Sequence, residues 1–215
     1  MTPNRLRRTE ISAALADTSW RFVLGSLRAS VAVTSLTGAV EVAQRLAPTG
    51  DSLAMDLRRD RVALTIQTDG WVSAADVEQA RRVAELVDLG SPGRSEQVVE
   101  LAIDAMDIAR VRPFWRAVLA YTDEPGAGPE DGVVDPLGQG PSVWFQRMTE
   151  PRPQRNRIHF DIAVPHDEAE TRIAAALEAG GTLIDGEAAP AFWVLSDPEG
   201  NEACITTWQG RDRIA

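Results

Sequence analysis

The chain contains few residues that could act as nucleophiles, proton carriers or metal ligands of the histidine and cysteine type, and these lie in its second half. There are two histidines, His159 and His166, one cysteine, Cys204, and no lysine. Schiff-base catalysis and a P-loop phosphate site both need lysine, so both are excluded. Histidine can transfer protons or bind a metal ion near neutral pH. Glu202 lies two residues before Cys204, so on a strand the two would share one face. These residues indicate acid–base or metal-assisted chemistry.

The elements that must position these residues form an internal repeat. Spaced apolar residues and turn residues predict the order strand, helix and three strands in residues 98–148 and again in residues 157–208. The run Asp197-Pro198-Glu199-Gly200 has the proline and glycine positions of a type I turn between the last two strands. When the two segments are overlaid, Glu100 and His159 occupy equivalent positions.

This second half resembles the glyoxalase-like, vicinal-oxygen-chelate superfamily. The matching residues are Asp107 and Phe114-Trp115 of the first helix, the run Ile158-His159-Phe160-Asp161, and the turn from Asp197 to Asn201. In that family, two βαβββ modules close around a central cavity. The metal-dependent members hold one divalent ion with four side chains that line the cavity.

The resemblance implies a metal site at Glu100, Gln146, His159 and Cys204. Glutamate and histidine suit a hard or borderline divalent ion, glutamine is a weak ligand, and cysteine favours a softer metal such as zinc. The expected cofactor is one divalent ion, Zn, Ni, Mn or Fe, and either Glu202 or Cys204 would be its last ligand. His159 and Glu202 would be catalytic, with the Glu202 carboxylate moving a proton.

Each of these residues also has a purely structural interpretation. A strand histidine such as His159 is often bonded to a backbone carbonyl, and Cys204 could be a small buried apolar side chain. Glu100 could be solvated, although its apolar neighbours mean that an inward carboxylate would need a partner. Aromatic residues could simply form the core, but four of them are also typical of an apolar substrate pocket: Trp115, Trp144, Phe160 and Trp193.

The first half predicts another unit, of order αββαββα, over residues 9–87. Trp20 and the run Gly70-Trp71-Val72-Ser73 resemble pterin-4a-carbinolamine dehydratase. That family uses a His-His-Pro motif and a further histidine, whereas here the stretches read Leu46-Ala47-Pro48 and Ile66-Gln67-Thr68-Asp69. Dehydration needs a proton donor and a base, so a non-catalytic dimerisation or packing module is expected. The alternative is residual dehydratase activity that uses Asp51, Asp56 or Asp69.

The length fits one large or two small domains. The Gly-, Pro- and Ser-rich linker favours two, with expected boundaries of 1–90, a linker at 91–96, and 97–215. The chain has 215 residues and a net charge of −10, which argues against binding to nucleic acid. No apolar run is long enough for a membrane span, and no apolar segment follows the basic N-terminus as in a secretory signal. With a single cysteine, these features favour the cytoplasm.

These observations predict an α+β protein, with a degenerate dehydratase-like domain followed by a glyoxalase-like domain. The expected function is binding, or metal-assisted conversion, of a small organic molecule in the second domain. Lyase or isomerase chemistry would apply if it is an enzyme. One alternative is a non-catalytic binding protein of the resistance type. The other is 4a-hydroxytetrahydrobiopterin dehydratase activity in the first domain. Both resemblances also favour a homodimer, by analogy.

Overall fold

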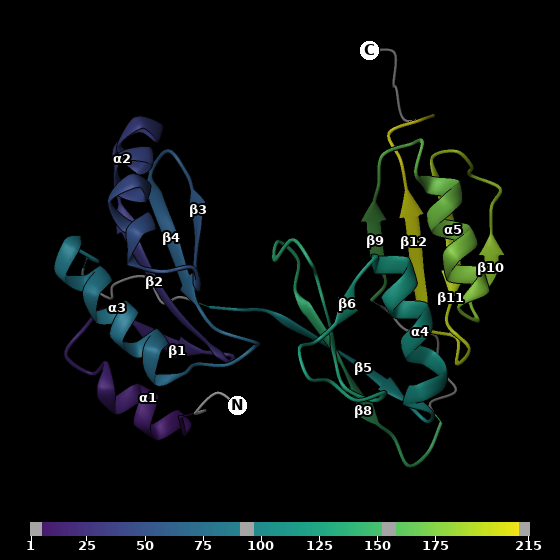
Figure 1. Cartoon of the computed structure of the whole chain (residues 1–215). Coiled ribbons are helices and arrows are strands. Elements are labelled where there is room, and N and C mark those ends of the chain that lie inside the picture. The colour runs from purple at the N-terminus through teal and green to yellow at the C-terminus, as the bar shows by residue number, and fades with distance from the viewer. Residues whose placement is uncertain (1–5, 91–96, 152–157, 211–215) are drawn as a thin grey trace. The chain divides into compact units, whose positions relative to one another are not determined.

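The structure, a computed structural model, describes residues 6–90, 97–151 and 158–210. The chain divides into two compact units, Met1–Val98 and Val99–Ala215, whose elements are labelled in Figure 1. Each unit has its own hydrophobic core. Both units combine helices with sheets, so the expected α+β class is confirmed. The longest helix among the described residues has 13 residues, and none is long and apolar enough to cross a membrane.

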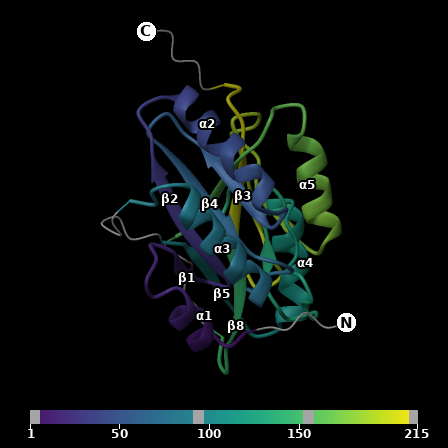
Figure 2. The ribbon, with the colours of Figure 1, turned by 60° about the vertical axis from the view of Figure 1, so that its left-hand side comes forward.

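The first unit has the expected αββαββα order. Its elements are α1 (Arg8–Ala14), β1 (Arg21–Val23), β2 (Ser26–Ala32), α2 (Leu36–Leu46), β3 (Leu53–Leu57), β4 (Arg61–Ile66) and α3 (Ala74–Leu86). A short 3-10 helix, Ala47–Thr49, follows α2. The four strands form one antiparallel sheet in the order β1-β2-β4-β3. Figure 2 shows α2 and α3 lying over this sheet, and both helices contribute side chains to its core.

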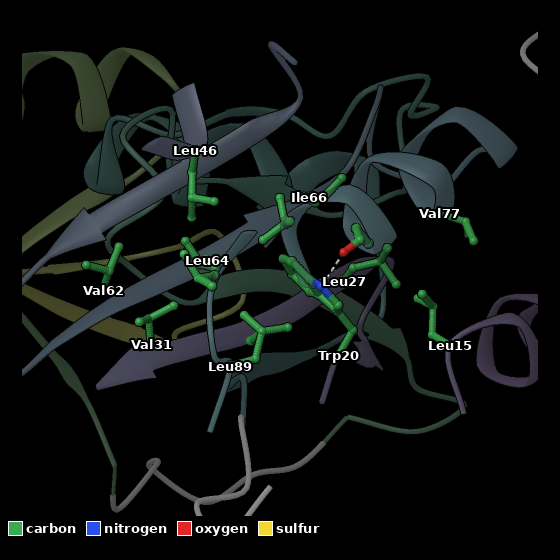
Figure 3. Close-up of a cluster of buried hydrophobic side chains, with 14 of the residues drawn as sticks. Leu15, Trp20, Leu27, Val31, Leu46, Val62, Leu64, Ile66, Val77 and Leu89 are labelled. Atoms are coloured by element: carbon green, nitrogen blue, oxygen red, sulfur yellow. Dashed lines mark hydrogen bonds between the residues drawn. The ribbon is translucent and has the colours of Figure 1, made fainter. Parts of the chain in front are cut away.

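Local sequence explains the packing of this unit. Val62, Leu64 and Ile66 alternate along β4 and are all buried, as their period of two predicts. Trp20 lies among them, and its indole N–H donates to the carbonyl oxygen of Ala80 at 2.8 Å (Figure 3). Helix α3 begins at a capping box in which Ser73 and Asp76 bond each other's backbone N–H groups.

The second unit contains two βαβββ modules, as expected. The first has β5 (Glu100–Ala105), α4 (Ile108–Leu119), β6 (Thr122–Asp123), β7 (Val133–Val134) and β8 (Ser142–Arg147). The second has β9 (Phe160–Ala163), α5 (Ala169–Glu178), β10 (Thr182–Asp185), β11 (Phe192–Ser196) and β12 (Glu202–Thr206). Their sheets have matching orders, β5-β8-β7-β6 and β9-β12-β11-β10. In each module the first strand pairs in parallel with the last.

Each sheet of the second unit has one face that packs against the helices and an opposite face, and successive residues of a strand alternate between the two. Ile103 and Ala105 of β5, and Ala203 and Ile205 of β12, are buried in the core beneath α4 and α5. The two helices lie side by side (Figure 1). The residues between these core positions therefore point to the other face of each sheet. That face carries Glu100 and Asp104 of β5, and Glu202, Cys204 and Thr206 of β12.

Candidate functional site

A cavity of about 680 Å³ lies in the second unit. Four consecutive residues of β5, from Leu101 to Asp104, line it, together with Phe160 of β9 and Glu202 of β12. The lining residues thus come from strands of both modules. Both β5 and β9 are edge strands of their sheets. The cavity therefore lies where the two modules meet.

Aromatic rings form one wall of this cavity. Trp115 of α4 is 1% exposed, and its ring meets Phe160 edge-on at a centroid distance of 5.5 Å. The Trp115 indole N–H donates to the buried carboxylate of Asp197 at 2.9 Å. The other oxygen of Asp197 accepts the backbone N–H groups of Glu199 and Asn201, both at 2.9 Å. Since Asn201 also lines the cavity, the turn holds polar and aromatic parts of the wall in place.

The same turn connects the two modules. The carboxylate of Glu199 accepts the backbone N–H of Met106 at 2.8 Å and that of Asp107 at 2.7 Å, where β5 leads into α4. Asp107 in turn caps α4, because its carboxylate accepts the N–H of Arg110. The sequence predicted only a turn here. Nothing in its residue types indicated that Glu199 would bind the backbone at the start of α4.

A second feature is a cluster of three possible metal ligands on β9 and β12. The sulfur of Cys204 lies 3.8 Å from Nδ1 of His159, and Nδ1 of His159 lies 3.4 Å from Oδ1 of Asp161. The three ligand atoms all lie within 4.8 Å of one another. Cys204 is buried and the other two residues are exposed, so the cluster is open to solvent on one side.

The structure brings together only part of the expected ligand set. His159 and Cys204 are in the cluster, whereas Glu100 and Gln146 lie on the other sheet. The Glu100 carboxylate accepts from the hydroxyl of Ser142 at 3.2 Å, and the Gln146 amide is 3.4 Å from the carbonyl of Arg147. Within the described part of the chain, the group of close ligand atoms includes neither Glu100 nor Glu202.

Two members of the site were missed from the sequence. Asp161 belongs to the ligand cluster, and Asp104 lines the cavity. The available signal for Asp161 was its spacing of two from His159 on a predicted strand, which puts both side chains on one face. Glu202 does not join the cluster, but it lines the cavity and shares a strand face with Cys204.

The four expected pocket aromatics separate into two groups. Trp115 and Phe160 line the cavity. Trp193 packs against the core cluster of the second unit, and Trp144 is 40% exposed on β8. The aspartates considered for dehydratase chemistry in the first unit, Asp51, Asp56 and Asp69, are all exposed.

Comparison with known proteins identifies the second unit. A sequence profile of the glyoxalase-like domain matches residues 100–206, and a search of curated proteins found no match. A solved fosfomycin resistance protein from Mesorhizobium loti is 10% identical, with a TM-score of 0.44 over 57% of this chain and 100% of that chain. A glyoxalase/bleomycin resistance protein/dioxygenase family enzyme from Burkholderia phytofirmans PsJN is 20% identical, with a TM-score of 0.40 over 50% of this chain and 95% of that one.

A transcriptional coactivator/pterin dehydratase from Brucella melitensis is 20% identical, with a TM-score of 0.34 over 39% of this chain and 99% of that chain. The profile match carries more information, because it begins at the first residue of β5 and ends at the last residue of β12. Residues 100–206 thus form a glyoxalase-like domain of the vicinal-oxygen-chelate superfamily, built from both βαβββ modules.

Proposed function

We propose that the glyoxalase-like unit binds a small organic molecule in the cavity between its modules. The observation that carries this proposal is the cavity itself. Its volume of about 680 Å³ falls within the range of small-molecule sites. Its lining combines apolar side chains such as Trp115 and Phe160 with three polar ones, Asp104, Asn201 and Glu202. Apolar walls with a few polar groups favour a ligand that is largely apolar and is oriented by hydrogen bonds.

Filling the cavity tests the proposal. Ala102 lines the cavity and is exposed, so Ala102→Trp should occupy ligand space without disturbing the core. Ala163→Trp is the matched control, because Ala163 is also an exposed alanine on an edge strand but does not line the cavity. Ligand-observed NMR would screen small aromatic compounds and thiol adducts against the full chain. Hits should lose binding in Ala102→Trp and keep it in Ala163→Trp. Equal binding by both variants would contradict the proposal.

A second candidate is metal-assisted lyase or isomerase chemistry on such a ligand, and the cluster of His159, Asp161 and Cys204 favours it. Imidazole, carboxylate and thiolate together fit a divalent ion such as zinc. A bound ion would polarise oxygen atoms of the substrate. Glu202 lines the cavity on the strand face of Cys204, so its carboxylate is suited to accept or return a proton there.

The two candidates differ in turnover. Thiol adducts and vicinal diols would be incubated with the chain in the presence of Zn²⁺, Ni²⁺, Mn²⁺ or Fe²⁺. If Glu202 transfers a proton, Glu202→Gln should lower kcat by roughly 10²-fold or more while ligand affinity changes little. The exposed Glu187→Gln is the control and should keep full activity. Ligand binding without turnover under any metal would support a non-catalytic binding protein instead.

For the first unit we propose a packing or dimerisation role without catalysis. Both histidines of the chain lie in the other unit, so this unit lacks the proton-transfer groups that the resembled dehydratases use. Turnover of a pterin carbinolamine by the full chain that survives His159→Ala and Glu202→Gln would contradict this proposal. Size-exclusion chromatography with light scattering would measure the expected homodimer.

A further inference from the structure

We propose that His159, Asp161 and Cys204 form a zinc site that belongs to the second module alone. This ligand set differs from the four positions shared between the modules that the family resemblance implies. It deepens the metal-assisted candidate above and rests on the same cluster, but its test measures metal binding alone, so it can fail while small-molecule binding in the cavity holds, and the reverse.

The strand pairing explains why these three residues meet. In the parallel pair of β9 and β12, Cys204 is directly opposite Asp161, and Ala203 is opposite Phe160. Phe160 and Ala203 pack on the core side, so the alternate residues point to the other face. His159 precedes Asp161 by two residues and lies on that same face. The three side chains therefore converge from two adjacent, hydrogen-bonded strands of one sheet.

The distances agree with tetrahedral zinc. Bonds of about 2.3 Å to sulfur and about 2.0–2.1 Å to nitrogen and oxygen place neighbouring S and N ligands roughly 3.6 Å apart, and N and O ligands roughly 3.4 Å apart. The cluster has 3.8 Å between Cys204 Sγ and His159 Nδ1, and 3.4 Å between that nitrogen and Asp161 Oδ1. The third pair, Cys204 Sγ and the Asp161 carboxylate oxygen, lies within 4.8 Å, so a movement of both side chains toward a shared ion would complete the geometry.

The same distances argue against a cysteine nucleophile. In a Cys-His-Asp catalytic arrangement, the thiol and the carboxylate contact different nitrogens of the imidazole ring. Here both Cys204 and Asp161 lie closest to a single nitrogen, Nδ1 of His159. A shared nitrogen is what a common metal ion requires, because each residue then offers one ligand atom to one point.

The donor types determine which metal would be selected. Cysteine thiolate prefers zinc and other soft or borderline ions, whereas Mg²⁺ and Mn²⁺ prefer oxygen ligands. Cys204 is buried, but it is outside the core cluster of the second unit, so its sulfur faces the polar side of the sheet. Three protein ligands leave a fourth position open, as in catalytic zinc sites. That position would be accessible because His159 and Asp161 are exposed.

Cobalt provides a direct test on the full chain, purified without an affinity tag. Co²⁺ titration should give one ion per chain, a thiolate-to-cobalt absorption band in the near ultraviolet, and displacement by Zn²⁺ but not by Mn²⁺. Cys204→Ser should abolish the band. His159→Ala and Asp161→Asn should each weaken Zn²⁺ binding by more than about tenfold, since even the loss of an outer hydrogen-bond partner costs that much.

Glu100→Gln is the matched control and should leave the affinity unchanged, because Glu100 lies outside the cluster. Circular dichroism would check the fold of each variant, and the exposed Asp161 is the substitution least able to disturb it. The proposal is overturned if the cobalt band is absent or persists in Cys204→Ser. It is also overturned if affinity falls in Glu100→Gln but not in Asp161→Asn, which would identify a site shared between the modules.

Discussion

Cys204 and His159 come within 3.8 Å of each other although 45 residues separate them in the chain. The contact joins Cys204 of β12 to the residue that precedes β9, and these two strands pair in parallel. A parallel pair needs a long crossover connection, here through α5, β10 and β11. The only thiol of the chain is thereby held against an imidazole and a carboxylate while it remains 7% exposed.

We expect the Cys204 thiol to react slowly with Ellman's reagent in the folded chain, because a buried thiol is poorly accessible. The chain has one cysteine, so the released chromophore should reach one equivalent after unfolding in guanidinium chloride. If the zinc site forms, Zn²⁺ should slow the native reaction further, and Asp161→Asn should remove this protection. A native rate equal to the unfolded rate would contradict the buried position of the thiol.

Asp197→Asn should destabilise the glyoxalase-like unit. One carboxylate oxygen accepts from the Trp115 indole and the Asn201 amide, and the other accepts two backbone N–H groups. In the Asn side chain an NH₂ group replaces one carboxylate oxygen. This NH₂ would face two N–H donors and could accept a hydrogen bond from neither. The expected loss is about 1–3 kcal/mol of unfolding free energy, measured by guanidinium denaturation. The control Asp185→Asn, at an exposed position, should change it by less than about 0.5 kcal/mol.

Much of the fold could be predicted because its signals are local. The alternation of apolar residues in Arg61–Ile66 predicted a strand, and the capping residues Ser73 and Asp76 predicted the start of a helix. The internal repeat correctly predicted two βαβββ modules. The strands Thr122–Asp123 and Val133–Val134 have two residues each, which is too short for a period of two to be recognised.

The candidate site was harder to predict because its contacts are non-local. The pairing of Cys204 with Asp161 depends on strand register, which no local pattern specifies when the pairing is parallel and the connection long. Four consecutive residues of the edge strand β5 line the cavity. A prediction from alternation assigns the side chains of this strand to its two faces, but it does not say which residues of other strands lie beside them.

Gln79 should be important for the loop between α2 and β3. It is 4% exposed, its amide N–H donates to the carbonyl of Gly50 at 2.9 Å, and its carbonyl accepts the Ser52 hydroxyl at 2.5 Å. Gln79→Leu would leave these partners unsatisfied, so we expect a loss of about 1–3 kcal/mol in unfolding free energy. Gln44→Leu, at an exposed position on α2, is the control, and an equal effect of both would contradict this role.

Tyr121 should titrate above the ordinary value of 10.0 for a phenol, because burial raises its pKa and the nearby Asp135 carboxylate raises it further. Burial alone would raise the pKa of Asp135, but backbone N–H groups of Leu137, Gly140 and Gln139 lower it more, so the net shift is downward and Asp135 stays charged. A raised phenol pKa means that the folded chain holds the proton more tightly than the unfolded chain. This stabilisation is therefore present below pH ~10 and is lost as pH rises through the folded pKa.

Tyr121 is the only tyrosine of the chain, so ultraviolet absorbance of the phenolate reports on it alone. The midpoint in the folded chain should lie above that measured in guanidinium chloride, and Asp135→Asn should move it part of the way back by removing the negative charge. Asp185→Asn changes the net charge equally at an exposed strand position and should leave the midpoint in place. A folded midpoint at or below the unfolded one would show that neither burial nor Asp135 acts on this phenol.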